Sequence, residues 1–297
     1  MKIAIAIGDP NGIGPEIAVK AAARAGVETV LVGDEFVLKH YGVGSPFHAV
    51  TALDKNSFKP GKLDPKAGAA TIAYAREAVR LAQAGEVDAV VGCPHSETAI
   101  NRAGIKFSGY PGLVAELTGT PEDRVFLMLV AQGLRIAHVT LHESVASALS
   151  RITEDRVVDA GMAAVRAAQR LGIDKPRLGV FGINPHAGED GLWGREDENI
   201  TKPAVAELRK RGVAADGPVG GDLMLSQRRH DVYLAMFHDQ GHIPMKLLSP
   251  LRSSALTIGT PILFSSVGHG CAYDIAGKGV ADSTSVEETL SLLGKSI

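Results

Sequence analysis

Short apolar runs alternate with longer amphipathic stretches along the chain. The unbroken apolar character of strands covered on both faces is found in KIAIAIG, TVLVG, DAVVGCP, RLGVFGIN, DVYLAMFH and PILFSSVGHG. Helical patterns lie between them over residues 14–25, 67–84 and 154–171. This alternation predicts βαβ units, and therefore an α/β fold in which helices cover both faces of mostly parallel sheets.

Polar and charged residues follow one of these strands, over residues 232–237, without a gap. The next nine residues are HDQGHIPMK, which contain His238, Asp239, His242 and Lys246. Ligands of open α/β sheets bind at the carboxyl ends of the strands, where loops vary while the sheet holds them in place. The sequence therefore predicts a ligand site at this edge.

Three separate strand-like runs each deliver a histidine to that edge. His238 follows one run and His186 follows RLGVFGIN, while IAHVTLH carries His138 and, at its end, His142. None of them has the i, i+4 spacing on a helix that marks a local zinc motif, and a single histidine in such a place is more often a hydrogen-bonding loop residue. Together, His142, His186 and His238 fit a three-histidine site with open coordination positions, as a catalytic zinc requires.

Two glycine-rich segments also follow strands. GDPNGIGPE, residues 8–16, fits either an anion site at a helix start or a plain strand-to-helix turn, and composition leaves both open. VGHGCAYDIAGKGVAD, residues 267–282, has the density of Gly, His and Asp of a ligand loop. An aspartate there, Asp274, can accept hydrogen bonds from both hydroxyls of an adenosine ribose and would repel a 2′-phosphate.

Composition narrows the class of protein. The chain has 297 residues, of which 45% are hydrophobic, so it can form two domains or one large one. A net charge of −2 offers no bulk attraction for nucleic acid or an anionic membrane. No apolar stretch is long enough to span a bilayer, and the N-terminus lacks a signal pattern, so we expect a cytoplasmic protein. Two cysteines, Cys93 and Cys271, fit a reducing compartment and exclude a structural thiolate zinc site.

Five motifs in order over nearly the whole chain carry a family resemblance. GDPNGIGPE, INPHAGEDGLWG, GGDLML, HDQGHIPMK and SSVGHGCAYDIAGKG resemble the 4-hydroxythreonine-4-phosphate dehydrogenase (PdxA-like) superfamily. The resemblance implies two α/β/α lobes of the isocitrate/isopropylmalate dehydrogenase type, with the active site in the cleft between them, and a homodimer that completes each site. It also implies a divalent metal, usually zinc, on His142, His186 and His238, and it places Asp222 and Lys246 in the substrate pocket. The reaction needs a proton acceptor and a proton donor near the metal, and we expect Asp222 and Lys246 to be these catalytic residues.

The same resemblance implies NAD as cofactor. The last motif looks like the HGSAPDIAGKG loop of isopropylmalate dehydrogenases, in which an aspartate at the position of Asp274 goes with NAD rather than NADP. We expect a nucleotide-binding lobe over residues 1–123 and 249–297, and a metal, substrate and dimerisation lobe over 124–248. The predicted NAD contacts are Asn184, Gly188, His269, Gly270, Ala272, Asp274 and Ile275.

Three positions depart from the phosphate-using members of that superfamily. Where those read GHTEFF, this chain reads GYPGLV, so Tyr110 replaces a histidine; Ala255 replaces an asparagine and Phe264 an arginine. Each lost charge-assisted partner weakens phosphate recognition, so the sequence predicts a substrate that is not a phosphate ester.

The stretches PHSETAINRAGIKFSGYPGL and VFLMLVAQGLRIAHVTLHESV are similar to one branch of the superfamily, the terephthalate cis-dihydrodiol dehydrogenases. We therefore predict NAD-linked oxidative decarboxylation of a small carboxylate, 1,2-dihydroxy-3,5-cyclohexadiene-1,4-dicarboxylate, to protocatechuate. Residues predicted to contact this substrate are Tyr110, Lys246, Arg252 and Phe264.

Three alternatives stay open on the sequence alone. The chain could oxidise 4-hydroxythreonine-4-phosphate or a related four-carbon phosphorylated hydroxy acid. The histidines could instead serve a metal-dependent phosphohydrolase, although acidic bridging ligands are missing. A non-catalytic binding protein could keep the fold alone, but nothing structural requires three histidines at strand ends.

Overall fold

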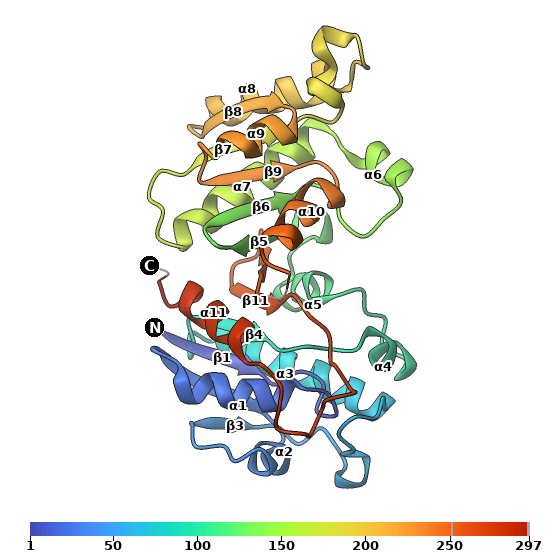
Figure 1. Ribbon diagram of the computed structural model, residues 1–297, viewed down its shortest axis with the longest axis vertical. Helices are drawn as coiled ribbons and strands as arrows, with labels where there is room; N and C mark the ends of the chain where they lie inside the picture. Colours follow the sequence, from blue (N-terminus) through green and yellow to red (C-terminus); the bar gives the residue numbers. More distant parts are fainter. Residues whose placement is uncertain (251, 296–297) are drawn as a thin grey trace. The chain divides into compact units, whose positions relative to one another are not determined.

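The computed structural model describes residues 1–250 and 252–295 (Figure 1). Contacts divide the chain into two compact units. Unit 1 comprises residues 1–120, 252–255 and 260–295, and unit 2 comprises residues 121–250 and 256–259. The nucleotide-binding and metal-binding roles assigned to the two predicted lobes remain predictions.

Unit 1 is built on a parallel sheet in the order β3-β2-β1-β4-β11. Its strands are β1 (Lys2–Ala6), β2 (Glu28–Gly33), β3 (Phe47–Ala49), β4 (Ala89–Gly92) and β11 (Leu263–Val267). Ile5 of β1 pairs with Leu31 on one side and Val91 on the other, and all three side chains are fully buried. The apolar runs thus form the sheet interior that their lack of polar alternation predicts.

Helices of unit 1 lie on both sides of this sheet (Figure 1). They are α1 (Gly14–Arg24), α2 (Glu35–His40), α3 (Pro65–Gln83), α4 (Glu97–Arg102), α5 (Tyr110–Thr118) and α11 (Thr284–Leu293). The chain steps from β1 to β2 through α1 and then back across β1 to β4 through α3. Because both crossovers are right-handed in such sheets, α1 and α3 cover opposite faces. Helix α11 packs beside α1.

Unit 2 contains sheet strands in the order β5-β6-β9-β7-β8. Its strands are β5 (Phe126–Ala131), β6 (Leu134–His138), β7 (Arg177–Phe181), β8 (Ala214–Val219) and β9 (Val232–Ala235). Strands β5 and β6 form an antiparallel hairpin, and the remaining pairs are parallel. The hairpin turns at Gln132 and Gly133, whose φ angles of 46° and 79° are those of the two central residues of a tight turn that matches strand twist.

The helices of unit 2 are α6 (Val145–Arg151), α7 (Glu154–Arg170), α8 (Lys202–Lys210), α9 (Gly221–Gln227) and α10 (His238–Leu248). Helix α7 packs on β5, β6, β7 and β9, and α10 packs on β5, β6 and β9. One further strand, β10 (Ser254–Ile258), has residues in both units. The α/β class with mostly parallel strands is confirmed. Among the described residues, no helix combines the length and apolar character that crossing a bilayer requires.

Candidate active site

Helix α10 begins at His238, immediately after β9, and a side chain fixes its start. The Gln240 carbonyl accepts hydrogen bonds from the backbone N–H groups of Met236 at 2.8 Å and Phe237 at 3.2 Å. The Gln240 amide donates to the carbonyl of Gly182 at 3.0 Å, which ties the helix start to the end of β7. HDQGH therefore opens a helix and is not a loop.

Because of this helix, His238 and His242 lie one turn apart on the same face. Their rings stack with centroids 3.6 Å apart and planes 11° from parallel. The ring of His142 lies 5.5 Å from that of His238, and His242 Nδ1 lies 3.2 Å from His138 Nε2. The predicted ligands His142, His186 and His238 have no helical i, i+4 spacing among themselves. His242, which was not predicted as a ligand, has this spacing from His238 because a helix starts there, which the sequence did not show.

Two of these imidazoles are held neutral. Burial, followed by the charge of His242, lowers the pKa of His138 to about 3. Burial, followed by the charge of His238, lowers the pKa of His242 to about 4. Cationic imidazoles at these two positions would repel one another and lose hydration, so His138 and His242 are neutral near pH 7.

His186 lies in a strained turn after β7. Five consecutive residues from His186 to Asp190 have positive φ, with values of 52°, 53°, 80°, 44° and 55°. Four of them carry side chains, and each such residue costs about 1–2 kcal/mol in this region. Strain of this kind persists where surrounding structure enforces it, and it is concentrated at functional sites.

The support for that turn is the carboxylate of Asp197, which is fully buried. Its two oxygens accept the N–H groups of Ile183 at 2.8 Å and Asn184 at 2.9 Å, and the Thr201 hydroxyl donates to it at 2.6 Å. Asp197 could not be found from the sequence, because the two N–H groups of the turn that it accepts lie 14 and 13 residues away and no local pattern marks it.

Two hollows in unit 2 hold most of the predicted catalytic chemistry. One, of about 610 Å³, is lined by Asn184, His186, Asp222 and Asp239 among others. The other, of about 330 Å³, is lined by His142, Glu143, His238 and Asp239 among others. Asp239 lines both hollows.

The predicted three-histidine set is only partly assembled. His142 and His238 are neighbours, but the described residues contain no group of three His, Cys, Asp or Glu side chains arranged to hold a metal. His186 Nδ1 lies instead 3.1 Å from Glu189 Oε2.

The chemistry of the donor set nevertheless fits zinc. His238 Nδ1 lies 2.7 Å from Asp239 Oδ1, and His186 Nδ1 faces the carboxylate of Glu189. A carboxylate that accepts the Nδ1 proton leaves the Nε2 lone pair for a metal, and metal-binding histidines almost always have such a partner.

Two predicted substrate contacts are core residues of unit 1. Tyr110 is 2% exposed and donates its hydroxyl to the carbonyl of Cys93 at 2.9 Å, while Phe264 is fully buried. Their rings lie 5.1 Å apart, and a Cβ on Gly92 would approach both rings within 3.0 Å. Both side chains pack in the core of unit 1, and their contact with substrate remains a prediction.

The other two predicted substrate contacts lie in different units. Lys246 lies on α10, two turns beyond His238, and is half-buried. Arg252 belongs to unit 1 and is exposed, with its guanidinium 3.8 Å from Glu288.

The residues predicted to bind NAD also fall into two groups. His269, Gly270, Ala272, Asp274 and Ile275 lie in unit 1 between β11 and α11, and Asp274 is exposed. Ile275 N–H donates to the carbonyl of Ala272 at 3.1 Å, which makes a tight turn beside Asp274. Asn184 and Gly188 lie in unit 2, where the Asn184 amide donates to Glu196 at 2.8 Å.

Comparison with known proteins identifies the family. A family described as pyridoxal phosphate biosynthetic protein PdxA matches residues 8–293. The chain belongs to this family. It is 52% identical to 1,2-dihydroxy-3,5-cyclohexadiene-1,4-dicarboxylate dehydrogenase from Comamonas sp, over 99% of this chain and 97% of that protein. It is also 39% identical to D-threonate 4-phosphate dehydrogenase from Cupriavidus necator, over 97% of this chain and 95% of that one.

Solved structures of PdxA-family and more distant proteins agree with this assignment. A terephthalate 1,2-cis-dihydrodiol dehydrogenase from Burkholderia xenovorans LB400 has 50% identity and a TM-score of 0.80, with 99% of this chain and 98% of that chain covered. Isocitrate dehydrogenase from Methylococcus capsulatus shares the fold. It has 16% identity and a TM-score of 0.50, with 99% of this chain and 85% of that chain covered. The relatives' names confirm the predicted superfamily and the dehydrogenase class.

Proposed function

We propose that the chain catalyses the NAD-linked, metal-dependent oxidative decarboxylation of terephthalate cis-dihydrodiol to protocatechuate. The observation that carries this proposal is the 52% identity, over 99% of the chain, to a dehydrogenase named for that dicarboxylate. The relative named for a phosphorylated four-carbon acid reaches 39%.

Two positions that are expected to bind phosphate in the phosphate-using enzymes carry aromatic residues here, which supports a substrate without phosphate. At positions 110 and 264, where the phosphate-using enzymes are expected to carry His and Arg, this chain has two aromatic rings packed together in the core. Neither ring supplies a cation, and a phosphate dianion depends on charge-assisted hydrogen bonds for recognition. The two carboxylates of the diol would use Lys246 and Arg252 instead.

We assign the metal, most simply Zn²⁺, to His142, His186 and His238. When bound, it would polarise the substrate hydroxyl oxygen and stabilise negative charge that develops there. The protein's part is to orient the ligands: Asp239 and Glu189 accept the Nδ1 protons, and the Asp197 carboxylate holds the strained turn that carries His186.

In the reaction, hydride leaves the hydroxyl-bearing carbon that lies next to the carboxylate-bearing carbon, and it reduces NAD. The proton of that hydroxyl passes to a base. The resulting β-keto acid loses carbon dioxide, and the electrons of the broken bond complete the aromatic ring as a phenolate, which then takes up a proton. Asp222, which lines the same hollow as His186, and Lys246 on α10 are the groups that we assign to these proton transfers.

We further propose a homodimer that associates through unit 2. Several large apolar side chains are exposed there, including Leu247 at 81%, Val145 at 73% and Leu192 at 69%. Seven of the ten large apolar side chains that are exposed among the described residues belong to unit 2. Exposed apolar patches mark protein–protein interaction sites.

A second candidate substrate is a phosphorylated four-carbon hydroxy acid, which the 39% identity to D-threonate 4-phosphate dehydrogenase favours. The phosphohydrolase and binding-protein interpretations gain nothing from these relatives, since both are named dehydrogenases.

The proposal is tested by incubating zinc-loaded protein with the diol and NAD and measuring NADH, carbon dioxide and protocatechuate together. We expect the three products in equal amounts, loss of all three with a chelator, and recovery with Zn²⁺. NADH formation without carbon dioxide, or full activity in chelator, would contradict the proposed chemistry.

A further inference from the structure

The segment between β11 and α11, residues 268–283, is here named the cofactor loop. It has no regular secondary structure, and it contains Gly268, Gly270, Gly277 and Gly279. Glycine-rich backbone loses much conformational entropy when it is fixed, so a single loop conformation needs partners outside the loop.

Its N-terminal limb, residues 271–273, is fixed by the turn that precedes α1. Ile13 N–H donates to the carbonyl of Cys271 at 2.9 Å, and the Tyr273 hydroxyl donates to Asp9 Oδ2 at 2.7 Å. Asp9 is fully buried, and burial raises its pKa. A Cβ at Gly12 would come within 2.8 Å of Cys271 Cβ. GDPNGIGPE is thus a strand-to-helix turn whose groups are used to hold this limb.

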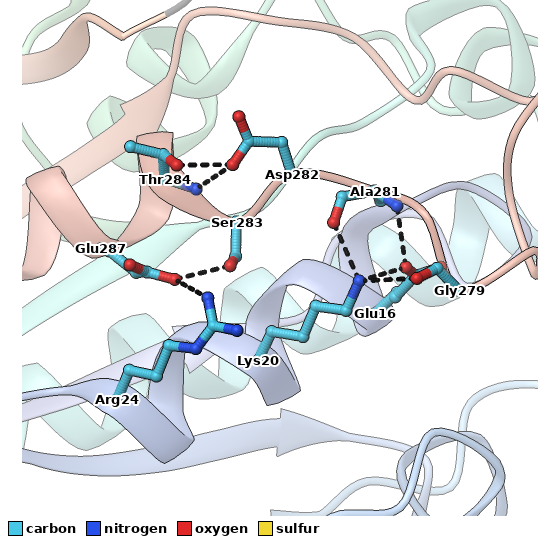
Figure 2. A network of polar contacts seen from close by, with 9 residues as sticks. All are labelled: Glu16, Lys20, Arg24, Gly279, Ala281, Asp282, Ser283, Thr284 and Glu287. Carbon is cyan, nitrogen blue, oxygen red and sulfur yellow. Dashed lines mark hydrogen bonds and ion pairs between the residues drawn. The ribbon is translucent and has the colours of Figure 1, made fainter.

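Its C-terminal limb, residues 279–281, is fixed by the first two turns of α1 (Figure 2). Lys20 Nζ donates to the carbonyls of Gly279 at 3.0 Å and Ala281 at 2.9 Å, and to Glu16 Oε1 at 2.7 Å. The same Glu16 oxygen accepts Ala281 N–H at 2.9 Å. An ammonium group has three protons, and this geometry uses all of them.

Between the two limbs, the tip of the loop points outward. Asp274, Gly277 and Lys278 are exposed, whereas Glu16 is 3% exposed beneath the limb. Both limbs are therefore attached to one helix and its entrance, and the part that carries the predicted ribose contact is left open to a ligand.

We propose that Glu16 and Lys20 are positioning residues for dinucleotide binding, because they hold the C-terminal limb of the cofactor loop in its binding conformation. This inference rests on the proposed NAD-linked function and on the predicted contact between Asp274 and the adenosine ribose of NAD. A loop held in place before binding loses less entropy when the ligand arrives, so the pair should act on dinucleotide affinity and not on the chemical step.

The test is the replacement Lys20→Met, which keeps the apolar stem and removes the three donors. The dissociation constant of NADH, measured by fluorescence titration without substrate, is expected to rise about tenfold or more. At saturating NAD, kcat and the KM for the acid should stay within about twofold of wild type.

The matched control is Arg24→Met, one turn further along α1. Arg24 pairs with Glu287 of α11 at 3.1 Å. The same Glu287 oxygen accepts the hydroxyl of Ser283, the last residue of the cofactor loop, at 2.6 Å, and this bond does not require Arg24. Its removal should leave NADH affinity unchanged. Hydrogen exchange adds a readout independent of activity: amides of residues 276–282 should exchange faster in Lys20→Met and not in Arg24→Met.

Lys20→Met leaves the buried Glu16 carboxylate without its cation, which itself destabilises the fold. The double replacement Glu16→Gln/Lys20→Met avoids this, since a Gln oxygen still accepts Ala281 N–H, and the same loss of NADH affinity is expected. If the folded variants bind NADH and exchange their amide hydrogens as wild type does, the positioning role of Glu16 and Lys20 is overturned while the proposed function stands. Failure of wild-type protein to bind NADH would overturn the proposed function, and this inference with it.

Discussion

At the scale of single residues, the carboxylates beside the predicted metal ligands decide which ring nitrogen is available. Asp239 lies 2.7 Å from His238 Nδ1 and lines both hollows of unit 2. Replacing it by Asn removes the charge that supports the ligand.

We therefore expect Asp239→Asn to weaken zinc binding about 10–100-fold, the usual effect of removing such a partner. Competition with a chelating dye measures the affinity directly. Asp174→Asn, an exposed carboxylate of the same unit, is the control and should bind zinc as wild type does. Unchanged zinc affinity in Asp239→Asn would show that Asp239 does not support a ligand.

A second residue-scale prediction concerns His95, whose ring lies 4.5 Å from that of Tyr110 and 5.0 Å from that of Phe107. Burial lowers the pKa of His95 to about 4 from an ordinary value of 6.5. Between these values the unfolded chain takes up a proton that the folded chain does not. The stabilising contribution of neutral His95 is thus complete above pH 6.5 and is lost as the pH falls towards 4.

From pH 7 to pH 5, wild type should lose about 1–2 kcal/mol more unfolding free energy than His95→Gln, which stays neutral throughout. Urea unfolding at the two pH values measures this difference. Equal losses in the two proteins would mean that His95 is protonated in the folded state at pH 5.

The sequence showed which side chains lie at the ends of strands, but it did not show which side chains pack against one another in the core. The neighbourhood of His142 and His238 followed from parallel strands that end at one sheet edge. The burial of Tyr110 and Phe264 did not, because it depends on the space left by Gly92, which is distant in sequence from both.

At the scale of elements, close approach of α10 to β6 depends on a missing side chain. A Cβ at Gly241 would lie 2.2 Å from His138 Nε2 and 2.9 Å from Ile136 Cγ2. Gly241 therefore lets α10, which carries the predicted site residues His238 and Lys246, lie directly on the sheet.

In an ordinary helix interior, Gly→Ala stabilises by about 1 kcal/mol. Gly241→Ala should instead destabilise by about 1–3 kcal/mol, because the buried His138 ring must move, and it should reduce activity as α10 shifts. Thermal unfolding and turnover check this. Gly26→Ala, where a Cβ would meet nothing within 4 Å, is the control. A more stable Gly241→Ala protein would contradict this packing.

The strands and long helices could be predicted because their patterns are local. The start of α10 could not, since few of its side chains are buried, Pro244 lies within it, and Gln240 finds its partner in Gly182, 58 residues away. Long-range side-chain bonds of this kind carry no periodic signal.

At the scale of the whole molecule, the chain forms two compact units, and residues after 251 contribute to both. The alternating pattern predicted the α/β class and the family resemblance implied two lobes, but which lobe takes each late strand depends on sheet pairing that the sequence does not reveal.

The proposed dimer gives a prediction at this scale. Leu192→Asp places a charge among the exposed apolar side chains of unit 2 and should lower the mass measured by light scattering from dimer to monomer. Leu63→Asp in unit 1 should remain dimeric. A Leu192→Asp dimer as stable as wild type would exclude this surface from the interface.

The central claim is that this PdxA-family chain oxidises the cyclohexadiene diol and not a phosphate ester. The most direct test compares kcat/KM of zinc-loaded protein for terephthalate cis-dihydrodiol and 4-hydroxythreonine-4-phosphate, with NAD at saturation. Two missing charge-assisted phosphate partners predict a preference for the diol of at least about 100-fold. A preference for the phosphate ester would contradict the account, and would mean that residues other than those at 110, 255 and 264 hold the phosphate.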